Sequence, residues 1–396
     1  MGNIFTYIEW RGDLTLSQSA FNEVDNLVLS TLCYLDLSGI VPAPGAGEIT
    51  IKNAAQRYFQ NTPVGSDTGR KDDESLQSLL FLLAKSCRYQ NMRVSALHKI
   101  LDIEKSEQFY AICFHVGYRQ LYLAYQGTSD DLAGWKEDFL LACMPEIPSQ
   151  ADALAYLENI SRLYPDKRLM LGGHSKGGNL AVYAAANASP SIQARIDCVW
   201  SNDGPGFQEE FLMSDGYLRI CNQVCNIVPK SSLVGMLLAH EENFRVIDSS
   251  QIGLLQHDGF SWLVSGDHFI EIRERSAQSV LAEQSIHSWL LEMPMAERRQ
   301  FVDELFDLMY ASGATSLSDI RKDRFRTVAA SLPMMKDMSK ESLSRIFQFL
   351  ILFRQITHRL NIESVMDHGK TALDKTVRGK GQRPAGVDNI EPNTEQ

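Results

Sequence analysis

The chain has 396 residues, 44% of them apolar, which is enough to bury a large core and to form one large domain with an accessory region, or two domains. A formal net charge of −11 argues against nonspecific binding to nucleic acid or to an anionic membrane, although a local basic patch can still exist. Seven cysteines without a CxxC pair exclude the usual zinc and redox motifs and are typical of buried thiols in a reducing compartment. From the acidic net charge we expect no nucleic-acid partner.

The beginning of the sequence, MGNIFTYIEWRGDLTL, lacks the basic start, apolar middle and cleavage site of a signal peptide. No apolar run reaches the roughly 18 residues that a membrane-spanning helix needs. We expect a cytoplasmic protein without an integral membrane segment.

Hydrophobic spacing predicts secondary structure along the first two thirds of the chain. In chain order, we expect helices at 16–37 and 75–89, an antiparallel strand pair at 109–119 and 120–126, a helix at 150–163, a strand at 168–173, a helix at 176–188, and strands at 195–202, 219–228, 243–248 and 261–265. Alternation of helix and strand after residue 126 is typical of βαβ units and a largely parallel sheet.

The character of the sequence changes near Ser276. Long amphipathic helical patterns follow without strand signals, and the residues beyond Gly369 include few large apolar side chains. We expect a main domain at 1–275, made of an N-terminal helical section at 1–90 and a core at 90–275, then a helical extension at 276–368 and a disordered tail at 369–396.

The segment LMLGGHSKGGNLAVYAAA contains a GxSxG motif with its serine at Ser175. An apolar strand precedes the motif and a helix rich in small residues follows it. In a nucleophile elbow, Gly173 and Gly177 permit strained backbone angles and close packing of strand on helix, so that the serine hydroxyl is presented at the carboxyl edge of the sheet. The alternative is a glycine-rich connection with a solvated serine.

A nucleophile elbow requires a general base later in the chain. Three of the later histidines, His287, His358 and His368, lie in or beyond the helical extension, and His240 follows an apolar helix-like stretch. His257 lies in a polar loop before a strand, and we take it as the base, with His268 as the reserve candidate.

Several motifs resemble those of class 3 lipases. The segment LAYQGTSDDLAGWKEDF is similar to the strand, RGT turn and WxxD pattern of that family, GHSKGG is similar to its GHSLGG elbow, and His257 with Gly259 and Trp262 is similar to its HxGxxW histidine loop. The resemblance implies an oxyanion hole formed by the N–H and hydroxyl of Thr128 together with the N–H of Lys176. It also implies an α/β-hydrolase fold.

The chain also resembles the Mbeg-like family of α/β-hydrolases. MGNIFTYIEW, GHSKGGN, DGPGF and SSLVGMLL followed by QHD carry this likeness, which spans about residues 1–275. The likeness supports the fold and a catalytic triad but brings no established substrate.

The acid of the triad departs from the lipase pattern. Asn226, in VCNIVPKSS, stands where class 3 lipases have their aspartate, and asparagine cannot compensate an imidazolium charge. Asp203 ends the preceding strand. Adjacent parallel strands lie only about 4.8 Å apart, so Asp203 can reach the same imidazole and is the leading candidate for the acid. Asp248 and Asp258 are weaker candidates, and Asp203 can also be a simple turn residue.

Lys176 follows the serine where lipases usually have leucine, and a lysine at a helix N-terminus opposes the helix dipole. One hypothesis is that its ammonium group faces the site and favours an anionic substrate group. The alternative is a solvated lysine.

These observations predict an α/β fold, specifically an α/β-hydrolase fold with a mostly parallel sheet. The expected function is a serine hydrolase that cleaves small-molecule or lipid esters with Ser175, His257 and Asp203, without a metal or organic cofactor. Residues 231–239 can line an acyl pocket, form a lid or belong to the core. A noncatalytic scaffold that keeps the same fold is the alternative function.

Overall fold

A computed structural model describes residues 2–62, 71–236, 238–239 and 244–380. Its centre is an eight-stranded sheet in which the strands lie in chain order. The first four strands are antiparallel and β4 to β8 are parallel. The strands are β1 (Glu48–Thr50), β2 (Arg93–Asp102), β3 (Glu107–His115), β4 (Gln120–Tyr125), β5 (Arg168–His174), β6 (Ile196–Asn202), β7 (Val224–Pro229) and β8 (Phe244–Ile247).

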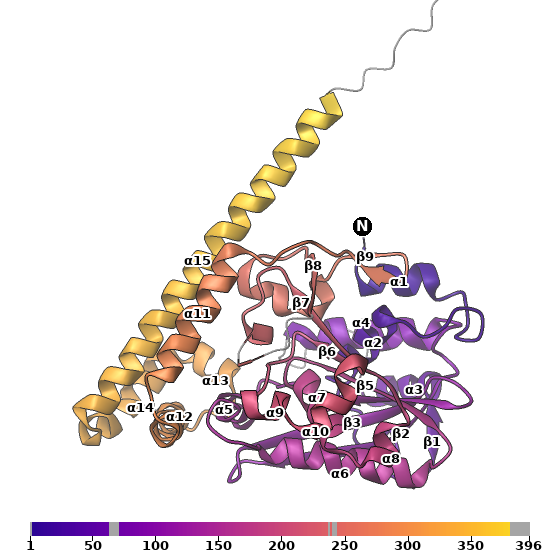
Figure 1. Ribbon diagram of the computed structural model, residues 1–396, viewed down its shortest axis with the longest axis horizontal. Coiled ribbons are helices and arrows are strands. Elements are labelled where there is room, and N and C mark those ends of the chain that lie inside the picture. The colour runs from indigo at the N-terminus through magenta and orange to yellow at the C-terminus, as the bar shows by residue number, and fades with distance from the viewer. Residues whose placement is uncertain (1, 63–70, 237, 240–243, 381–396) are drawn as a thin grey trace, which may run out of the picture.

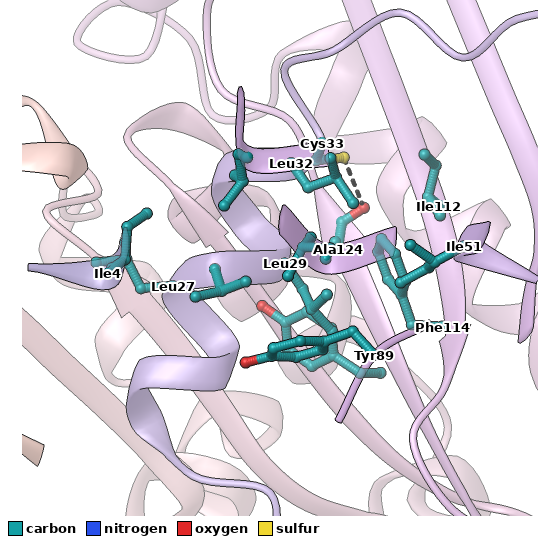
Figure 2. Packing of buried hydrophobic residues seen from close by; sticks show 14 of the residues in the cluster. Ile4, Leu27, Leu29, Leu32, Cys33, Ile51, Tyr89, Ile112, Phe114 and Ala124 are labelled. Carbon is teal, nitrogen blue, oxygen red and sulfur yellow. Dashed lines mark hydrogen bonds between the residues drawn. The ribbon is translucent and has the colours of Figure 1, made fainter. Parts of the chain in front are cut away.

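Helices cover both faces of the sheet (Figure 1). Because successive strand residues point to opposite faces, Tyr122 and Ala124 of β4 pack in one core and Leu121 and Leu123 pack in the other. The first core includes α1 (Ile4–Arg11), α2 (Glu23–Leu32), α3 (Ile51–Asn61) and α4 (Lys71–Lys85), and part of it is drawn in Figure 2. The second includes α6 (Pro148–Leu163), α7 (Lys176–Asn187), α8 (Pro190–Gln193) and α10 (Asp215–Ile220). The result is the predicted α/β fold with a mostly parallel sheet, with helices on both of its faces.

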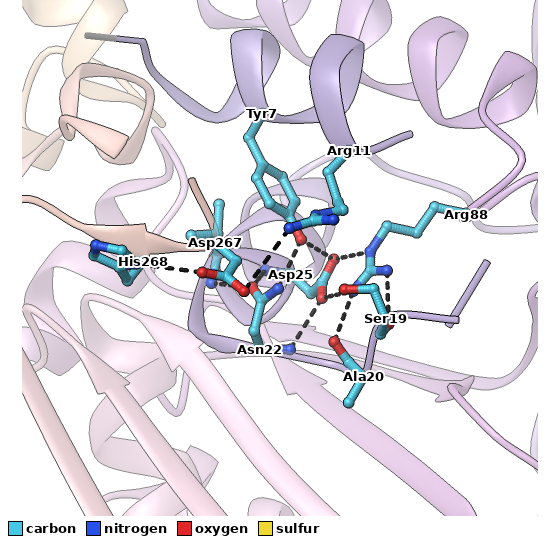
Figure 3. Close-up of polar contacts among 10 residues, drawn as sticks. Tyr7, Arg11, Ser19, Ala20, Asn22, Asp25, Arg88, Asp267 and His268 are labelled. Atoms are coloured by element: carbon cyan, nitrogen blue, oxygen red, sulfur yellow. Dashed lines mark hydrogen bonds and ion pairs between the residues drawn. The ribbon is translucent and has the colours of Figure 1, made fainter. Parts of the chain in front are cut away.

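A buried ion pair fixes the N-terminal helices to the rest of the first core (Figure 3). Asp25, at the start of α2, lies against the guanidinium group of Arg88, and both side chains are fully buried. Arg88 also donates to the carbonyl oxygens of Ser19 and Ala20 at 2.9 Å, and Tyr7 of α1 donates to Asp25 at 3.1 Å. Asp25 and Arg88 therefore compensate each other's charge out of contact with water. Removal of either side chain would leave the other charge buried and uncompensated, which would destabilise the fold.

The C-terminal extension is helical. It consists of α11 (Ala277–Leu291), α12 (Met295–Tyr310), α13 (Leu317–Lys322), α14 (Arg324–Asp337) and α15 (Lys340–Lys380). Apolar residues of α12 pack on α5 (Leu132–Leu140), and α15 packs on the 3₁₀ helix η3 (Gly253–His257). Both α5 and η3 carry residues of the candidate site described below.

Two predicted elements differ from the structure. Residues 219–228 were expected to form one strand, but the chain continues α10 to Ile220 and η1 (Cys221–Gln223) before β7 begins at Val224. Ser214 caps α10, whose Tyr217 and Ile220 are buried at helical spacing, and this spacing outweighs the β propensity of the segment. Helix α15 also continues to Lys380, past the predicted start of the tail at Gly369, and residues 381–396 lie outside the described residues.

Hydrophobic spacing did not predict α1, α3, β1 or β2, and two further predicted elements are shorter in the structure. The predicted helix at 16–37 is limited to α2 because Asn22 caps it with a capping box. The predicted strand at 261–265 is reduced to β9 (Val264–Ser265), which pairs with β10 (His268–Phe269), preceded by the 3₁₀ helix η4 (Gly259–Ser261). A short helix, α9 (Glu209–Leu212), lies between β6 and α10.

Candidate active site

Ser175 lies on a tight turn between β5 and α7. Its φ of 57° and ψ of −133° lie in a region that residues other than glycine rarely adopt. The flanking glycines are required by packing, since a Cβ atom on Gly173 would lie 2.2 Å from the Gly177 carbonyl carbon, and one on Gly177 would lie 2.1 Å from the Tyr125 carbonyl oxygen. The strand, turn and helix predicted from GxSxG are therefore present, with the backbone conformation of a nucleophile elbow.

Asp203 follows β6 and is fully buried beside the elbow. It has a positive φ of 53°, and its N–H donates to Ile227 O in the neighbouring strand at 2.8 Å. One carboxylate oxygen, Oδ1, accepts from the hydroxyl of Ser232. The other, Oδ2, lies 2.6 Å from Nδ1 of His257. Asp203 is thus the acid that contacts the predicted base.

His257 ends η3 and keeps about a quarter of its side chain exposed, at 27%. Because a carboxylate faces Nδ1, this nitrogen carries the proton and donates it to Asp203, which leaves Nε2 as the basic nitrogen. Among the described residues, the Ser175 hydroxyl makes no hydrogen bond with His257. Contacts of this kind often become short only when substrate is bound.

His174, the residue before the serine, connects the elbow to the His257 segment. Its Nε2 lies 2.6 Å from His257 O, and the two imidazole rings are 4.6 Å apart. Since a carbonyl oxygen only accepts, Nε2 carries the proton, and Nδ1 accepts from the hydroxyl of Tyr34 at 3.0 Å. Burial lowers the pKa of His174 to about 3, so its ring is neutral.

Sequence reasoning missed His174 and Tyr34 as site residues. His174 is inside the recognised GHSKGG motif, but it precedes the serine and so does not fit the order of a triad. Tyr34 comes from the loop after α2, and nothing in its local sequence indicates its contact with the elbow. Ser232 and Gly235 were also missed as partners of Asp203. A Cβ atom on Gly235 would lie only 2.1 Å from Asp203 Oδ1.

Thr128 lies after β4, next to Gly127, which is itself packed against the elbow. A Cβ atom on Gly127 would lie 2.5 Å from His174 O and 3.1 Å from Ser175 Cβ. The Thr128 hydroxyl donates to Asp138 Oδ2 at 2.6 Å. A hydroxyl has one proton, so in this arrangement the Thr128 hydroxyl has none to offer an oxyanion, and only its N–H can serve. This limits the role that the resemblance assigned to the Thr128 side chain.

Asp138 is partly buried beside the charged side chains of Glu137 and Lys176. Its Oδ1 atom is buried and has no hydrogen-bond partner among the described residues. Burial raises the pKa of Asp138 to about 6, and the Lys176 ammonium opposes this rise. Protonation of Asp138 would let it donate to Thr128 and free the threonine proton. Asp138 therefore controls which way the Thr128 hydroxyl points.

The side chain of Lys176 is fully buried, which excludes the solvated lysine that we considered. Its ammonium group lies 2.7 Å from Glu137 Oε2 and donates to Gln108 O at 3.0 Å. Glu137 is also fully buried and accepts from the backbone N–H of Ser149 and of Gln108 at 2.9 and 3.2 Å. The hypothesis of an ammonium group that faces an anionic substrate is therefore wrong, because the charge is already compensated.

Helix α5 thus holds both sides of the predicted oxyanion hole. Glu137 binds the side chain of Lys176, and its neighbour Asp138 binds Thr128. As the first residue of α7, Lys176 has a backbone N–H that the helix itself does not use. Compensation by Glu137 also explains how a lysine is tolerated at a helix N-terminus.

The other candidates lie elsewhere. His268 is exposed and pairs with Asp267 at 3.3 Å, and Asp248 accepts from the N–H of Ser249. Asp258 caps η4 by accepting from Phe260 N. Asn226 lines a small cavity with Ser201 and Phe207. The carboxylate that contacts Nδ1 of His257 is that of Asp203 instead.

The segment 231–239 also takes a definite position where it is described. Ser231, Ser232 and Leu233 are buried, and Ser232 binds Asp203. This part supports the acid and belongs to the core. Residue 237 lies outside the described residues, as do residues 240–243, including the histidine at 240.

No metal-binding group of three or more His, Cys, Asp or Glu side chains occurs in the described part of the chain. The helices described are too short or too polar to cross a membrane.

A family model described as Mbeg1-like matches residues 83–307, more than half of the chain. The chain belongs to the Mbeg1-like family. No curated protein matches it. The Mbeg1-like match covers β2 to β8, the elbow, η3, α11 and most of α12. The helix-covered sheet with a serine elbow is an α/β-hydrolase fold.

Solved lipase structures are weakly similar to this chain. The native Rhizomucor miehei lipase propeptide complex is 14% identical with a TM-score of 0.30, and the match covers 40% of this chain and 57% of that one. Lip2 lipase from Yarrowia lipolytica is 15% identical with a TM-score of 0.30, over 49% of this chain and 76% of that one. Lipase II from Rhizopus niveus is 12% identical with a TM-score of 0.30, over 50% and 78%. The chain therefore spans little more than half the length of the Rhizomucor miehei enzyme.

Proposed function

We propose that this protein is a serine hydrolase that cleaves carboxylic esters through an acyl-enzyme intermediate. The observation that carries the proposal is the 2.6 Å contact between His257 Nδ1 and Asp203 Oδ2 beside the strained elbow at Ser175. A buried carboxylate at Nδ1 orients the imidazole and stabilises the imidazolium that forms during proton transfer. A histidine in a merely structural role would not need an acid with this geometry.

In the proposed first half-reaction, Ser175 Oγ attacks the ester carbonyl carbon and its proton moves to Nε2 of His257. The tetrahedral intermediate then collapses, the bond to the alcohol oxygen breaks, and the alcohol leaves with the proton from Nε2. In the second half-reaction, His257 takes a proton from water, and the hydroxide attacks the acyl group. Collapse then releases the carboxylic acid, and Ser175 regains its proton from His257.

The backbone N–H groups of Thr128 and Lys176 would stabilise the negative charge that develops on the carbonyl oxygen. Support comes from the fixed positions of both residues, each held by a carboxylate of α5. Fixed donors stabilise a developing charge without the cost of reorganisation.

Esters of lipids or of small carboxylic acids are the proposed substrates. The motifs shared with class 3 lipases support them, since these motifs surround the serine, the histidine loop and the QGT turn. We also propose 1–275 as the catalytic domain and 276–368 as an extension. The seven cysteines are all free, which supports a reducing compartment such as the cytoplasm.

A noncatalytic scaffold with this fold is the second candidate. It is favoured by one observation, the missing hydrogen bond between Ser175 and His257 in the described part of the chain. The departure from the lipase pattern at Asn226 also favours a scaffold, but the contact between Asp203 and His257 supports Asp203 as the acid and so supports the hydrolase.

Labelling with a fluorophosphonate probe distinguishes the two functions. We expect the wild-type protein to be labelled at Ser175, as shown by mass spectrometry of the modified peptide, and Ser175→Ala to remain unlabelled. Asp203→Asn should slow labelling by several orders of magnitude, since an amide would favour the wrong tautomer of His257. Ser288→Ala, at an exposed serine in α11, is the matched control and should label at the wild-type rate. Absence of labelling at Ser175 would favour the scaffold.

A further inference from the structure

Two helices of the C-terminal extension expose apolar side chains in rows. On α14, Phe325, Val328 and Leu332 are 93, 61 and 50% exposed and follow one another at spacings of three and four residues. Side chains at these spacings lie on one face of a helix. Lys336, also exposed, continues the same face one turn further. We call Phe325, Val328, Leu332 and Lys336 the α14 stripe.

Helix α15 repeats the pattern. Phe347, Leu350 and Ile351 are 51, 48 and 57% exposed, and they share a face with Lys340 and Arg354, which lie seven residues before and after Phe347. We call these five residues the α15 stripe. An exposed apolar row of this kind is unusual on a surface that contacts only water.

The charge of this region is opposite to that of the whole protein. Residues 320–360 include nine Lys or Arg and three Asp or Glu, a net charge of +6, in a chain whose net charge is −11. Lys336, Lys340 and Arg354 are exposed and form no ion pair within the described residues. Their charges are therefore available to an external partner.

The opposite face of α15 contacts the proposed active site. Leu352, Ile356 and Leu360 pack with Leu254 of η3 and with Leu233, and η3 ends at His257. Figure 1 shows α15 along the outer edge of the extension, with α11 beside it. The helix that exposes the α15 stripe thus directly supports the segment that bears the proposed base.

We propose that the α14 and α15 stripes bind an anionic lipid surface. Apolar side chains in line with lysine and arginine are the composition of helices that lie in the membrane interface, where the apolar groups enter the acyl boundary and the cations meet anionic headgroups. A second copy of the chain fits less well, because face-to-face packing would bring the in-line cations of both copies together. The purpose that we infer for this binding is to bring the proposed active site to lipid esters. This part of the inference rests on the proposed function.

The test uses the full chain carrying Ser175→Ala, so that binding is measured without any hydrolysis. The assay is flotation with vesicles of phosphatidylcholine alone and with vesicles that contain about a third phosphatidylglycerol. We expect binding to the anionic vesicles, much weaker binding to the neutral ones, and a loss of binding at high salt. Failure of the proposed catalysis would leave this result unchanged.

Two sets of substitutions examine the α15 stripe. Phe347→Ser with Leu350→Ser and Ile351→Ser should abolish flotation. Lys340→Gln with Arg354→Gln should weaken it by about fivefold per residue, because each basic group near an anionic surface is worth about 1 kcal/mol. All five positions are partly or fully exposed, so the melting temperature should stay near that of the parent.

Met213→Ser with Leu218→Ser is the matched control, since these residues are 71 and 54% exposed but lie near α9 and α10. This variant should float like the parent. The proposal is overturned if the parent does not bind anionic vesicles, or if the stripe variants bind as well as the control. It is also overturned if light scattering shows a dimer that the apolar substitutions convert to a monomer, since the α15 stripe would then be a dimer interface.

Discussion

Replacing Lys176 by methionine should destabilise the protein strongly. The change keeps most of the aliphatic chain but removes the ammonium group that lies 2.7 Å from Glu137 Oε2. Both side chains are fully buried, so no water can take over the role of the cation. Glu137 would keep its bonds from the backbone N–H groups of Gln108 and Ser149 but would lose its compensating charge.

Removal of one partner from a buried ion pair costs about 3–5 kcal/mol of unfolding free energy, because the remaining charge stays buried without compensation. For a domain of this size, each kcal/mol lowers the melting temperature by about 2–4 °C, so we expect a decrease of about 10 °C.

The assay is a double-mutant cycle by urea denaturation with Lys176→Met, Glu137→Gln and the double variant. The double variant should recover part of the stability, because it buries no unpaired charge. Recovery should be incomplete, because the amide nitrogen of Glu137→Gln would face one of the two backbone N–H groups that donate to the carboxylate. Labelling by a fluorophosphonate should follow the same order, since the backbone N–H of Lys176 belongs to the proposed oxyanion hole.

Two results would refute this reasoning. One is a loss below about 1 kcal/mol for Lys176→Met, which would mean that the ammonium group does not compensate a buried carboxylate. The other is simple additivity, in which the double variant loses the sum of the two single losses, because residues in one buried pair must show a coupling energy.

Three further predictions concern neighbours of the proposed triad and of the proposed oxyanion hole. Gly235→Ala would bring a Cβ atom to 2.1 Å from Asp203 Oδ1. It should therefore displace the proposed acid and slow fluorophosphonate labelling at least tenfold. An unchanged rate would show that Asp203 does not need this position. Burial raises the pKa of Asp138 to about 6 from an ordinary 3.8. Between these two pH values the folded protein keeps a proton that the unfolded chain has released, so the unfolding free energy falls as the pH rises from about 4 to 6. Asp138→Asn should remove that contribution, about 2 kcal/mol between pH 4 and pH 7, as measured by urea denaturation at the two pH values. A pH dependence equal to that of wild type would contradict the assignment. Tyr34→Phe removes the hydroxyl that donates to Nδ1 of His174 and leaves a buried acceptor unpaired. It should lower the unfolding free energy by about 1–3 kcal/mol, measured by urea denaturation. An unchanged unfolding free energy would show that packing alone holds the His174 ring.

Local sequence determined the elements around the proposed nucleophile, Ser175. Gly173 and Gly177 flank Ser175 at the spacing that a sharp turn requires, and an apolar run before them and a row of small residues after them specify strand and helix. These features depend on residues close in the chain. This is why β5, the elbow and α7 agree with prediction to within a residue or two.

Local propensity was misleading where burial on one face set the structure. Residues 219–223 include a single strand-favouring residue, Ile220, which is buried with Tyr217 on the helical face of α10, and the strand begins only at Val224. Apolar residues recur every two positions in a strand and every three or four in a helix, and these two patterns cannot be distinguished over so few residues.

Only the tertiary structure distinguishes the candidate acids by their contact with His257 and shows what Lys176 contacts. At the level of sequence, Asp203, Asp248 and Asp258 all remained candidates, and only the folded chain brings the first of them to His257. Likewise, nothing near Lys176 indicates that its ammonium group is buried against Glu137, a residue 39 positions earlier. The sequence by itself determined the strand, the turn and the serine, because backbone conformation is set by neighbours. The pairing of buried charges depends on which distant groups share the same desolvated space, and only the assembled fold specifies that.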